Sequence, residues 1–126
     1  MTEKELEVAA SGFLDTAFNL GEPETAVSEH VGDRFVQHNP QVADGAEAFI
    51  AFVHSMRSQF PKMHLEITRA ITQDEMVVTH SHLTLTPGAP GLAFADFFRF
   101  EGGKVVEHWD VIQNIPDASA NSNGMF

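Results

Sequence analysis

The chain of 126 residues contains no cysteine and no tyrosine, and it has a single tryptophan. Without cysteine there can be no disulfide framework, no thiol nucleophile and no thiolate metal site. Without tyrosine there is no phenol to donate a hydrogen bond to a developing oxyanion. If the protein stabilises such an oxyanion, a histidine or a protonated aspartic acid must do it.

Basic residues and long apolar runs are also scarce. Lys and Arg number 7 against 18 Asp and Glu, which gives a formal net charge of −11. Because no basic patch is available to neutralise phosphates, we expect neither nucleic acid nor an anionic membrane as a partner. No apolar run approaches the ~20 residues that span a bilayer, and the charged N-terminal residues lack a signal-peptide core. We therefore expect a cytoplasmic protein.

What is present is the composition of an ordinary soluble domain, with 43% hydrophobic and 20% charged residues. The length suffices for one core that buries about two thirds of the unfolded surface. No linker, repeat or low-complexity segment divides the chain. We predict a single domain over residues 1–116, followed by a flexible tail over residues 117–126 that is rich in Ala, Ser, Asn and Gly.

Apolar residues recur at helical spacing in the first half of the chain and alternate with period two in the second half. Helix start and stop signals predict helices over residues 2–21, 23–31 and 44–60, with a short extended piece over 34–38. Four strands are predicted over residues 64–72, 76–86, 92–101 and 104–115. This order predicts an α+β fold in which three N-terminal helices pack on one face of a curved antiparallel sheet.

The last predicted hairpin is the most informative part of the chain, and its register depends on the turn at Gly102-Gly103. A three-residue loop with Gly103 in the left-handed conformation would pair Phe100 with Lys104. A two-residue Gly-Gly turn would shift the pairing by one position. We favour the three-residue loop because its type I turn needs no special residue at its central positions.

The register decides which side chains share a face of the sheet. In the favoured register, Asp96 lies opposite His108, and Asp110 lies opposite Phe94 on the same face. The same face would also carry the apolar side chain of Phe98. In the alternative register, the two aspartates would point to opposite faces. The favoured register therefore predicts an apolar cavity wall that carries two carboxylates and an imidazole.

Asp110 is the leading candidate for acid/base chemistry. It lies among apolar strand residues, where desolvation raises the pKa of a carboxyl group toward the range useful to a general acid or base. Asp96 would add to this effect, because two neighbouring carboxylates repel each other and one of them takes a higher pKa. His108 would pair with Asp96, which selects its tautomer. The alternative is that these residues form a structural ion pair.

Three further histidines are candidates for the cavity. His80 and His82 share one strand face, and two imidazoles at that spacing can bind a metal ion. No acidic residue follows them within the strand, so we predict no metal and no cofactor. We assign both to the cavity wall, where they would bind a substrate carbonyl; an outward polar sheet face is an alternative of comparable weight. We also assign His38 to the cavity, because it lies at the end of the extended piece that Pro40 terminates. The rings of Phe94 and Phe98 are assigned to the cavity as well.

Three segments of the chain match a known family: Gln37-His38-Asn39-Pro40, Asp44-Gly45, and the run from Asp96 to Gln113. On these segments the chain resembles the SnoaL-like, polyketide cyclase-like group of the nuclear transport factor two-like superfamily, over nearly its whole length. The resemblance implies a cone-shaped fold around a deep pocket. In the cyclases of this group an aspartate on the last strand is the acid/base, and Asp110 matches it. Their pocket histidine on the preceding strand is replaced here by Asp96.

We therefore expect a small cofactor-independent enzyme that binds a small hydrophobic carbonyl compound while Asp110 moves a proton. Aldol-type cyclisation, isomerisation and dehydration all fit, because each needs one acid/base and one hydrogen-bond donor in a dry cavity. The alternative is a binding or scaffold domain that holds such a ligand without converting it.

A homodimer is also expected. In the favoured register, the outer face of the sheet carries Phe97, Val105, Trp109 and Val111. Because that apolar patch is large for a monomer to expose, we predict that two copies associate through it.

Overall fold

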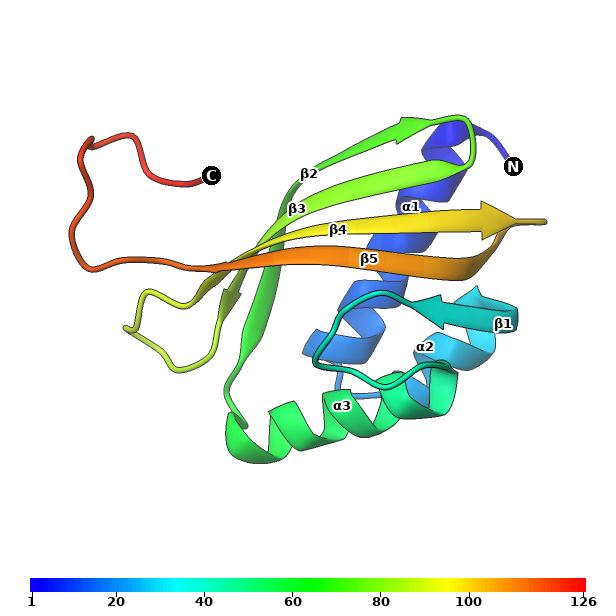
Figure 1. Cartoon of the computed structure of the whole chain (residues 1–126), viewed down its shortest axis with the longest axis horizontal. Helices are drawn as coiled ribbons and strands as arrows, with labels where there is room; N and C mark the ends of the chain where they lie inside the picture. Colours follow the sequence, from blue (N-terminus) through cyan, green and yellow to red (C-terminus); the bar gives the residue numbers. More distant parts are fainter.

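A computed structural model describes residues 1–126 and shows helices packed on one face of a five-stranded sheet, with α1 behind the sheet and α3 below it (Figure 1). The elements follow in the order α1 (Glu3–Leu14), π-helix η1 (Asp15–Asn19), α2 (Pro23–His30), β1 (Val31–Gln37), α3 (Ala46–Gln59), β2 (His64–Gln73), β3 (Met76–Thr84), β4 (Leu92–Glu101) and β5 (Lys104–Asn114). The predicted α+β fold is thus confirmed. The sheet order is β1-β5-β4-β3-β2, and β1 runs parallel to β5, so the sheet is mixed rather than wholly antiparallel.

Helix α1 begins where its capping residue predicts. The Thr2 hydroxyl oxygen accepts a hydrogen bond from the Glu5 amide at 3.1 Å, which satisfies a donor at the helix start. The helix ends in the wider turn of η1, where the Leu20 amide donates to the Asp15 carbonyl at 3.0 Å. Asn19 in that turn exchanges two hydrogen bonds with the backbone of Leu65, at 2.8 and 2.9 Å. These bonds fasten the end of the helix to β2, beside the cavity described below.

Helix α3 begins two residues later than predicted. Its N-cap is Gly45, which has a positive φ of 95°, and no side chain caps the helix. Asp44, the predicted cap, instead accepts a hydrogen bond from the Gln37 backbone amide at 2.8 Å. The carboxylate therefore ties the approach to α3 to the end of β1.

The hairpin of β4 and β5 has the two-residue turn rather than the predicted three-residue loop. Glu101 pairs with Lys104, and the two glycines between them both have a positive φ, of 56° and 80°. Two positive φ values are the signature of the type I′ turn, whose twist matches that of the flanking strands. The hairpin prefers this turn because both of its central residues are glycines.

A β-bulge then changes the register within the same hairpin. Arg99 pairs with Glu107 while Phe100 pairs with Val105, which leaves Val106 as the extra residue. As a result Asp96 lies opposite Asp110, not opposite His108 as predicted. The two aspartates nevertheless share one face, because the bulge reverses the effect of the shorter turn.

The core lies between the helices and the inner face of the sheet. Its aromatic centre is Phe13, whose ring stacks on Phe49 at 5.0 Å and meets the ring of Phe98 edge-on at 5.9 Å. Val105, predicted on the outer face, is fully buried in this core because of the bulge.

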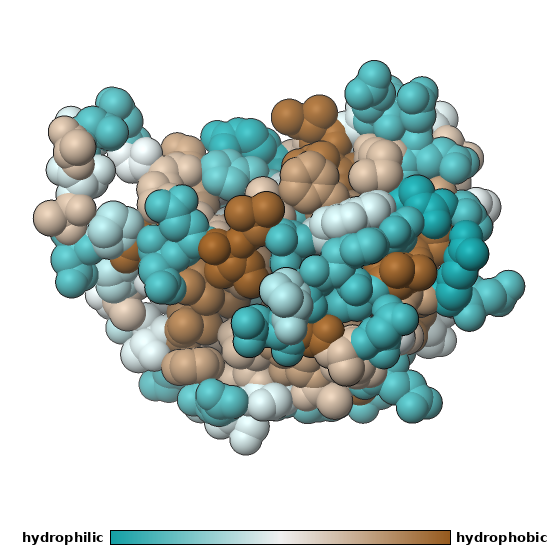
Figure 2. All heavy atoms as spheres, viewed as in Figure 1, coloured by the Kyte–Doolittle hydropathy of each residue, from teal (hydrophilic) through white to brown (hydrophobic).

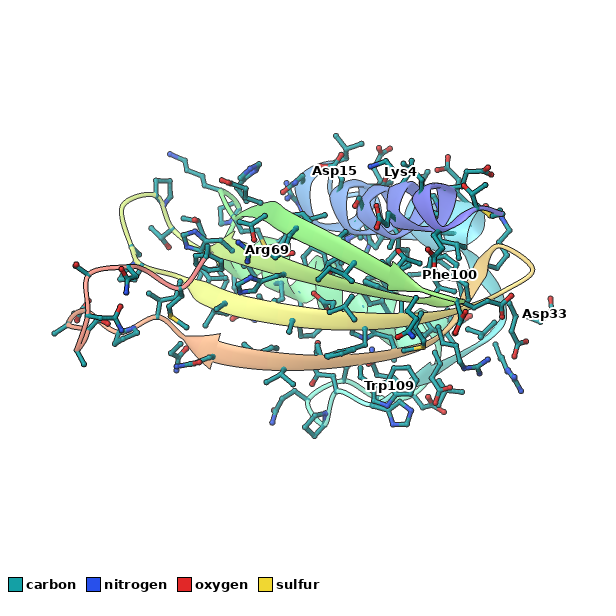
Figure 3. All side chains as sticks on the ribbon, turned by 90° about the horizontal axis from the view of Figure 1, so that it is seen from above. Lys4, Asp15, Asp33, Arg69, Phe100 and Trp109 are labelled. Atoms are coloured by element: carbon teal, nitrogen blue, oxygen red, sulfur yellow. The ribbon has the colours of Figure 1, made fainter.

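The outer face of the sheet carries the other residues predicted there. Trp109 points away from α1 (Figure 3), and Val111 is 66% exposed. Figure 2 looks onto this side of the sheet and shows apolar side chains in separate patches among hydrophilic ones. The chain end turns back toward the sheet (Figure 1), where the ring of Phe126 stacks on that of His82 at 4.7 Å. No helix combines the length and the hydrophobicity that crossing a bilayer requires.

Candidate active site

A narrow cavity lies between the inner face of the sheet and helices α1, η1 and α3. Its enclosed volume is about 20 Å³, and the space between its wall atoms reaches about 450 Å³ when the open mouth is included. Nine of the 14 lining side chains are hydrophobic, among them Phe18, Phe52, Leu83 and Phe94. The remaining five are polar and come from β1, β4, β5 and the segment after β1: Gln37, Asn39, Asp96, His108 and Asp110. An apolar cavity with a few convergent polar groups is the usual form of a small-molecule site.

Strand alternation brings these polar groups together. His108 and Asp110 are two residues apart on β5, so both side chains point inward. Asp96 joins them from β4, because it pairs with Asp110 across the ladder. Gln37 pairs with His108 from the parallel strand β1, and Asn39 follows two residues later.

Asp96 and His108 form a buried pair. Asp96 Oδ1 lies 2.8 Å from His108 Nε2, and only 5% and 7% of the two side chains are exposed. The contact is diagonal across the ladder, since the residue directly opposite His108 is Phe98.

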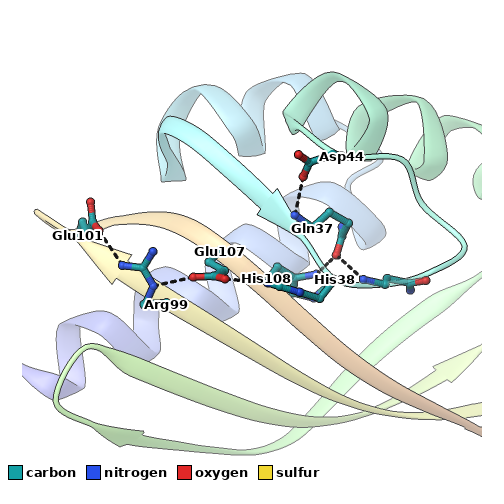
Figure 4. Close-up of polar contacts among 8 residues, drawn as sticks. Gln37, His38, Asp44, Arg99, Glu101, Glu107 and His108 are labelled. Carbon is teal, nitrogen blue, oxygen red and sulfur yellow. Dashed lines mark hydrogen bonds and ion pairs between the residues drawn. The ribbon is translucent and has the colours of Figure 1, made fainter.

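Gln37 determines the tautomer of His108. The Gln37 side-chain oxygen accepts a hydrogen bond from the Asn39 backbone amide at 3.1 Å and lies 2.8 Å from His108 Nδ1. Because a backbone N–H can only donate, the atom that it meets on Gln37 is the carbonyl oxygen, and His108 Nδ1 must carry a hydrogen. Figure 4 shows the contacts of Gln37. Because Nδ1 carries one hydrogen, the contact between His108 Nε2 and Asp96 needs a second proton, which lies either on Nε2 or on the Asp96 carboxyl group.

Asp110 has a different environment. Its Oδ2 accepts a hydrogen bond from the Asn39 side-chain amide at 2.9 Å, and its Oδ1 has no partner within the protein. Burial raises the pKa of Asp110 above its ordinary value, and the negative charge of Asp96 acts in the same direction. The hydrogen bond from Asn39 and the charge of His108 oppose this rise. The cavity thus contains one carboxylate with a free oxygen and a raised pKa.

The same three side chains come close enough to one another to hold a metal ion. One ligand atom each of Asp96, His108 and Asp110 lies within 4.8 Å of the others. However, His108 Nδ1 faces Gln37 and Nε2 faces Asp96, so neither ring nitrogen is free as a ligand. A metal ion would have to break one of these contacts, and the prediction of no metal stays a prediction.

A comparison with known protein families matches residues 10–108 to the SnoaL-like domain. The match covers well over half of the chain and includes β1, β4 and β5 as far as His108, while Asp110 lies two residues beyond its end. This chain belongs to the SnoaL-like domain family. A comparison with curated protein sequences found no match.

Solved structures confirm the fold of this SnoaL-like domain. TsrD from Streptomyces laurentii is 19% identical with a TM-score of 0.73, and the match covers 89% of this chain and 90% of that one. A provisionally assigned polyketide cyclase from Bacillus cereus is 20% identical with a TM-score of 0.75, over 89% and 78% of the two chains. A SnoaL-like protein of unknown function from Burkholderia thailandensis is 18% identical with a TM-score of 0.75, over 90% and 99%. At these identities the likeness shows the fold alone.

Of the predicted site residues, the structure brings Asp96, His108, Asp110 and Phe94 together around the cavity of the SnoaL-like domain. Phe98 does not line the cavity. It is fully buried in the core, where its ring lies 5.1 Å from that of His108 and packs against it. Phe98 thus packs against the His108 imidazole from the core.

His80 and His82 lie outside the cavity, which corrects their assignment to its wall. Val77 and Leu83 are buried on the inner face of β3, so the alternation of the strand places both histidines on the outer face. There His82 Nε2 lies 2.7 Å from the Pro90 carbonyl oxygen, and Phe126 packs against both rings.

His38 also lies on the outer face rather than in the cavity. Its Nε2 lies 2.7 Å from Glu107 Oε2, and its ring stacks on Trp109. The residues on either side of it, Gln37 and Asn39, point inward and were missed. The sequence contained a signal for both. Phe35 is apolar and is expected on the inner face of the sheet, and strand alternation from Phe35 places Gln37 and Asn39 on that same face.

Proposed function

We propose that this SnoaL-like domain is an enzyme that needs no cofactor and moves a proton at the carbon next to the carbonyl group of a small hydrophobic compound. Asp110 Oδ1 takes the proton, and the electron pair of the C–H bond moves into the carbonyl group to give an enolate. Return of the proton from Asp110 to a different atom gives isomerisation. Attack of the enolate on a second carbonyl group, whose oxygen then takes the proton from Asp110, gives aldol-type cyclisation. Loss of a β-hydroxyl group, which takes that proton and leaves as water, gives dehydration.

The observation that carries this proposal is the environment of Asp110. A general base needs a free oxygen, a pKa closer to neutrality than that of an exposed carboxyl group, and a site that excludes water. Asp110 has an unpaired Oδ1, a raised pKa and nine hydrophobic side chains around the cavity that it faces. The B. cereus relative provisionally assigned as a polyketide cyclase supports the same class of reaction.

A donor for the enolate oxygen is available on the same wall. The side-chain oxygen of Gln37 is held by Asn39 and His108, while its amide nitrogen has no hydrogen-bond partner in the protein. We infer that this N–H donates to the substrate carbonyl oxygen, where negative charge develops. This assignment gives the part of the absent tyrosine to the amide of Gln37, and not to a histidine or a protonated aspartic acid as the composition had led us to expect.

Exchange of α-hydrogens for deuterium tests this function without knowledge of the natural substrate. A panel of small hydrophobic ketones and 1,3-diketones is incubated with the protein in D₂O, and the loss of the α-proton signals is followed by ¹H NMR. We expect the wild type to accelerate exchange for members of the panel. Asp110→Asn, which keeps the hydrogen bond to Asn39, should lower the rate by about 100-fold or more.

The control is Asp33→Asn, which removes an exposed carboxylate on β1 outside the cavity and should leave the rate unchanged. If compounds of the panel bind, as shown by changes in their chemical shifts, but exchange no faster than with Asp110→Asn, the enzymatic proposal is wrong. That result would favour a domain that binds the ligand without converting it.

A further inference from the structure

Two tripeptides run side by side at the polar wall of the cavity, and each residue of one contacts its counterpart in the other. The first is Gln37-His38-Asn39 at the end of β1, and the second is His108-Trp109-Asp110 in β5. On the cavity side, Gln37 lies 2.8 Å from His108, and Asn39 donates to Asp110 at 2.9 Å. On the outer side, the rings of His38 and Trp109 stack with centroids 4.7 Å apart and an interplanar angle of 3°.

Little backbone pairing fixes this arrangement beyond the end of β1. β1 ends at Gln37, and the next hydrogen bond to β5 joins the His38 amide to the His108 carbonyl at 3.0 Å. The other backbone amides of this segment donate within it: the Gln41 amide donates to Asn39 Oδ1, and the Gln37 amide donates to the Asp44 carboxylate. Internal bonds shape the segment but do not hold it against β5. Side-chain contacts with β5 must therefore do so.

His38 makes the contacts on the outer side. Besides stacking on Trp109, its Nε2 lies 2.7 Å from Glu107 Oε2, and Glu107 Oε1 accepts from Arg99 Nε at 2.8 Å (Figure 4). The imidazole is thus held between a ring and a carboxylate that both belong to β5. Arg99 in turn keeps that carboxylate in place from β4.

We propose that His38 is a positioning residue: by stacking on Trp109 outside the sheet, it holds Gln37 and Asn39 against His108 and Asp110 inside the cavity. This inference rests on the proposed function only for its effect on rate. Its effect on the geometry of Asp110 can be measured whether or not the protein is an enzyme.

The test compares three variants by the titration of Asp110, followed through its ¹³C-labelled carboxyl group by NMR. Asn39→Ala removes the hydrogen bond that stabilises the carboxylate, so the measured pKa of Asp110 should rise. His38→Ala should shift the pKa in the same direction by at least half as much, because Asn39 is no longer held in place. His38→Phe retains a stacked ring and should behave like the wild type.

The matched control is His54→Ala. His54 is an exposed histidine on α3 that pairs with Glu24 at 2.8 Å, much as His38 pairs with Glu107, but it lies away from the cavity. It should leave the pKa of Asp110 unchanged. Fluorescence emission from Trp109, the single tryptophan, shows whether the ring stacked on it is lost in each variant. Circular dichroism shows whether the variant remains folded.

The same variants separate this inference from the proposed function. If the wild type exchanges α-hydrogens, His38→Ala should slow the exchange by about tenfold to 100-fold, as expected for a small misplacement of reacting groups, and His38→Phe should restore it. A shifted pKa without any exchange by the wild type would sustain the positioning role and overturn the function. Exchange by the wild type with an unchanged pKa in His38→Ala would overturn the positioning role and sustain the function. If His38→Phe behaves like His38→Ala, the stacked ring is not what holds the segment, and the inference is wrong.

Discussion

At the scale of single residues, Asp96 and Asp110 differ in what balances their charge. Asp96 shares a proton with His108, and the other side of that imidazole is held by Gln37. Asp110 accepts a hydrogen bond only from the neutral amide of Asn39, and the charge of His108 acts on it without a direct contact. An ionised carboxylate in such a site lowers the stability of the fold, because the unfolded chain would hydrate it fully. Natural proteins retain costs of this kind where function requires them.

Asp110→Asn should therefore raise the midpoint of thermal unfolding at pH 7. The pKa of Asp110 is raised on folding, so the stability linked to its titration is complete below the unfolded pKa, about 3.9, and is lost as the pH rises through the folded pKa. We expect the variant to exceed the wild type by about 2–4 °C at pH 7 and to show no advantage near pH 3. Scanning calorimetry across this range measures the difference, with Asp33→Asn as the control. A midpoint that falls at pH 7 would instead identify Asp110 as part of a structural network.

At the scale of elements, local signals predicted the helices and strands, while contacts distant in sequence determined the site. The Thr2 cap, the apolar spacing and the glycine turns indicated each element to within a few residues. Nothing in Val105-Val106 indicates which valine is the bulged one, because both have the same strand preference and both are buried. The pairing of β1 with β5 joins segments about 70 residues apart and has no local signal. The shared face of Asp96 and Asp110 was therefore predicted correctly from a register that was wrong.

A substitution at Gly91 tests how closely the backbones of β3 and β4 must approach where β4 begins. Gly88 in the same loop is the control. Both glycines have a positive φ, of 81° and 86°, which costs any other residue about 1–2 kcal/mol. A Cβ at Gly91 would lie 2.3 Å from the Leu83 carbonyl oxygen, whereas one at Gly88 would meet nothing within 4 Å. Gly91→Ala should therefore cost about 3 kcal/mol or more and Gly88→Ala about 1 kcal/mol, as measured by urea unfolding. Equal losses would show that β3 and β4 can separate there without strain.

At the scale of the whole molecule, the two faces of the sheet have different roles. The inner face closes the core and the cavity, while the outer face leaves Trp109 and Val111 facing outward and carries the His38–Trp109 stack. Because the two sets of side chains alternate along β5, a change on the outer face is one residue away from His108 or Asp110. A partner that binds the outer face would therefore contact the strand that carries His108 and Asp110.

We predict that a second copy of the chain covers this face, and matched surface substitutions test the prediction. Val111 on the outer face and Val8 on α1 are exposed to similar extents, 66% and 62%, but on opposite sides of the sheet. Val111→Glu should convert a dimer into a monomer, because it would place like charges across a symmetric contact, whereas Val8→Glu should not. Sedimentation velocity at micromolar concentration gives the mass of each species. A wild type that sediments as a monomer, or a dimer that Val8→Glu dissociates and Val111→Glu does not, would show that the outer face is not the contact.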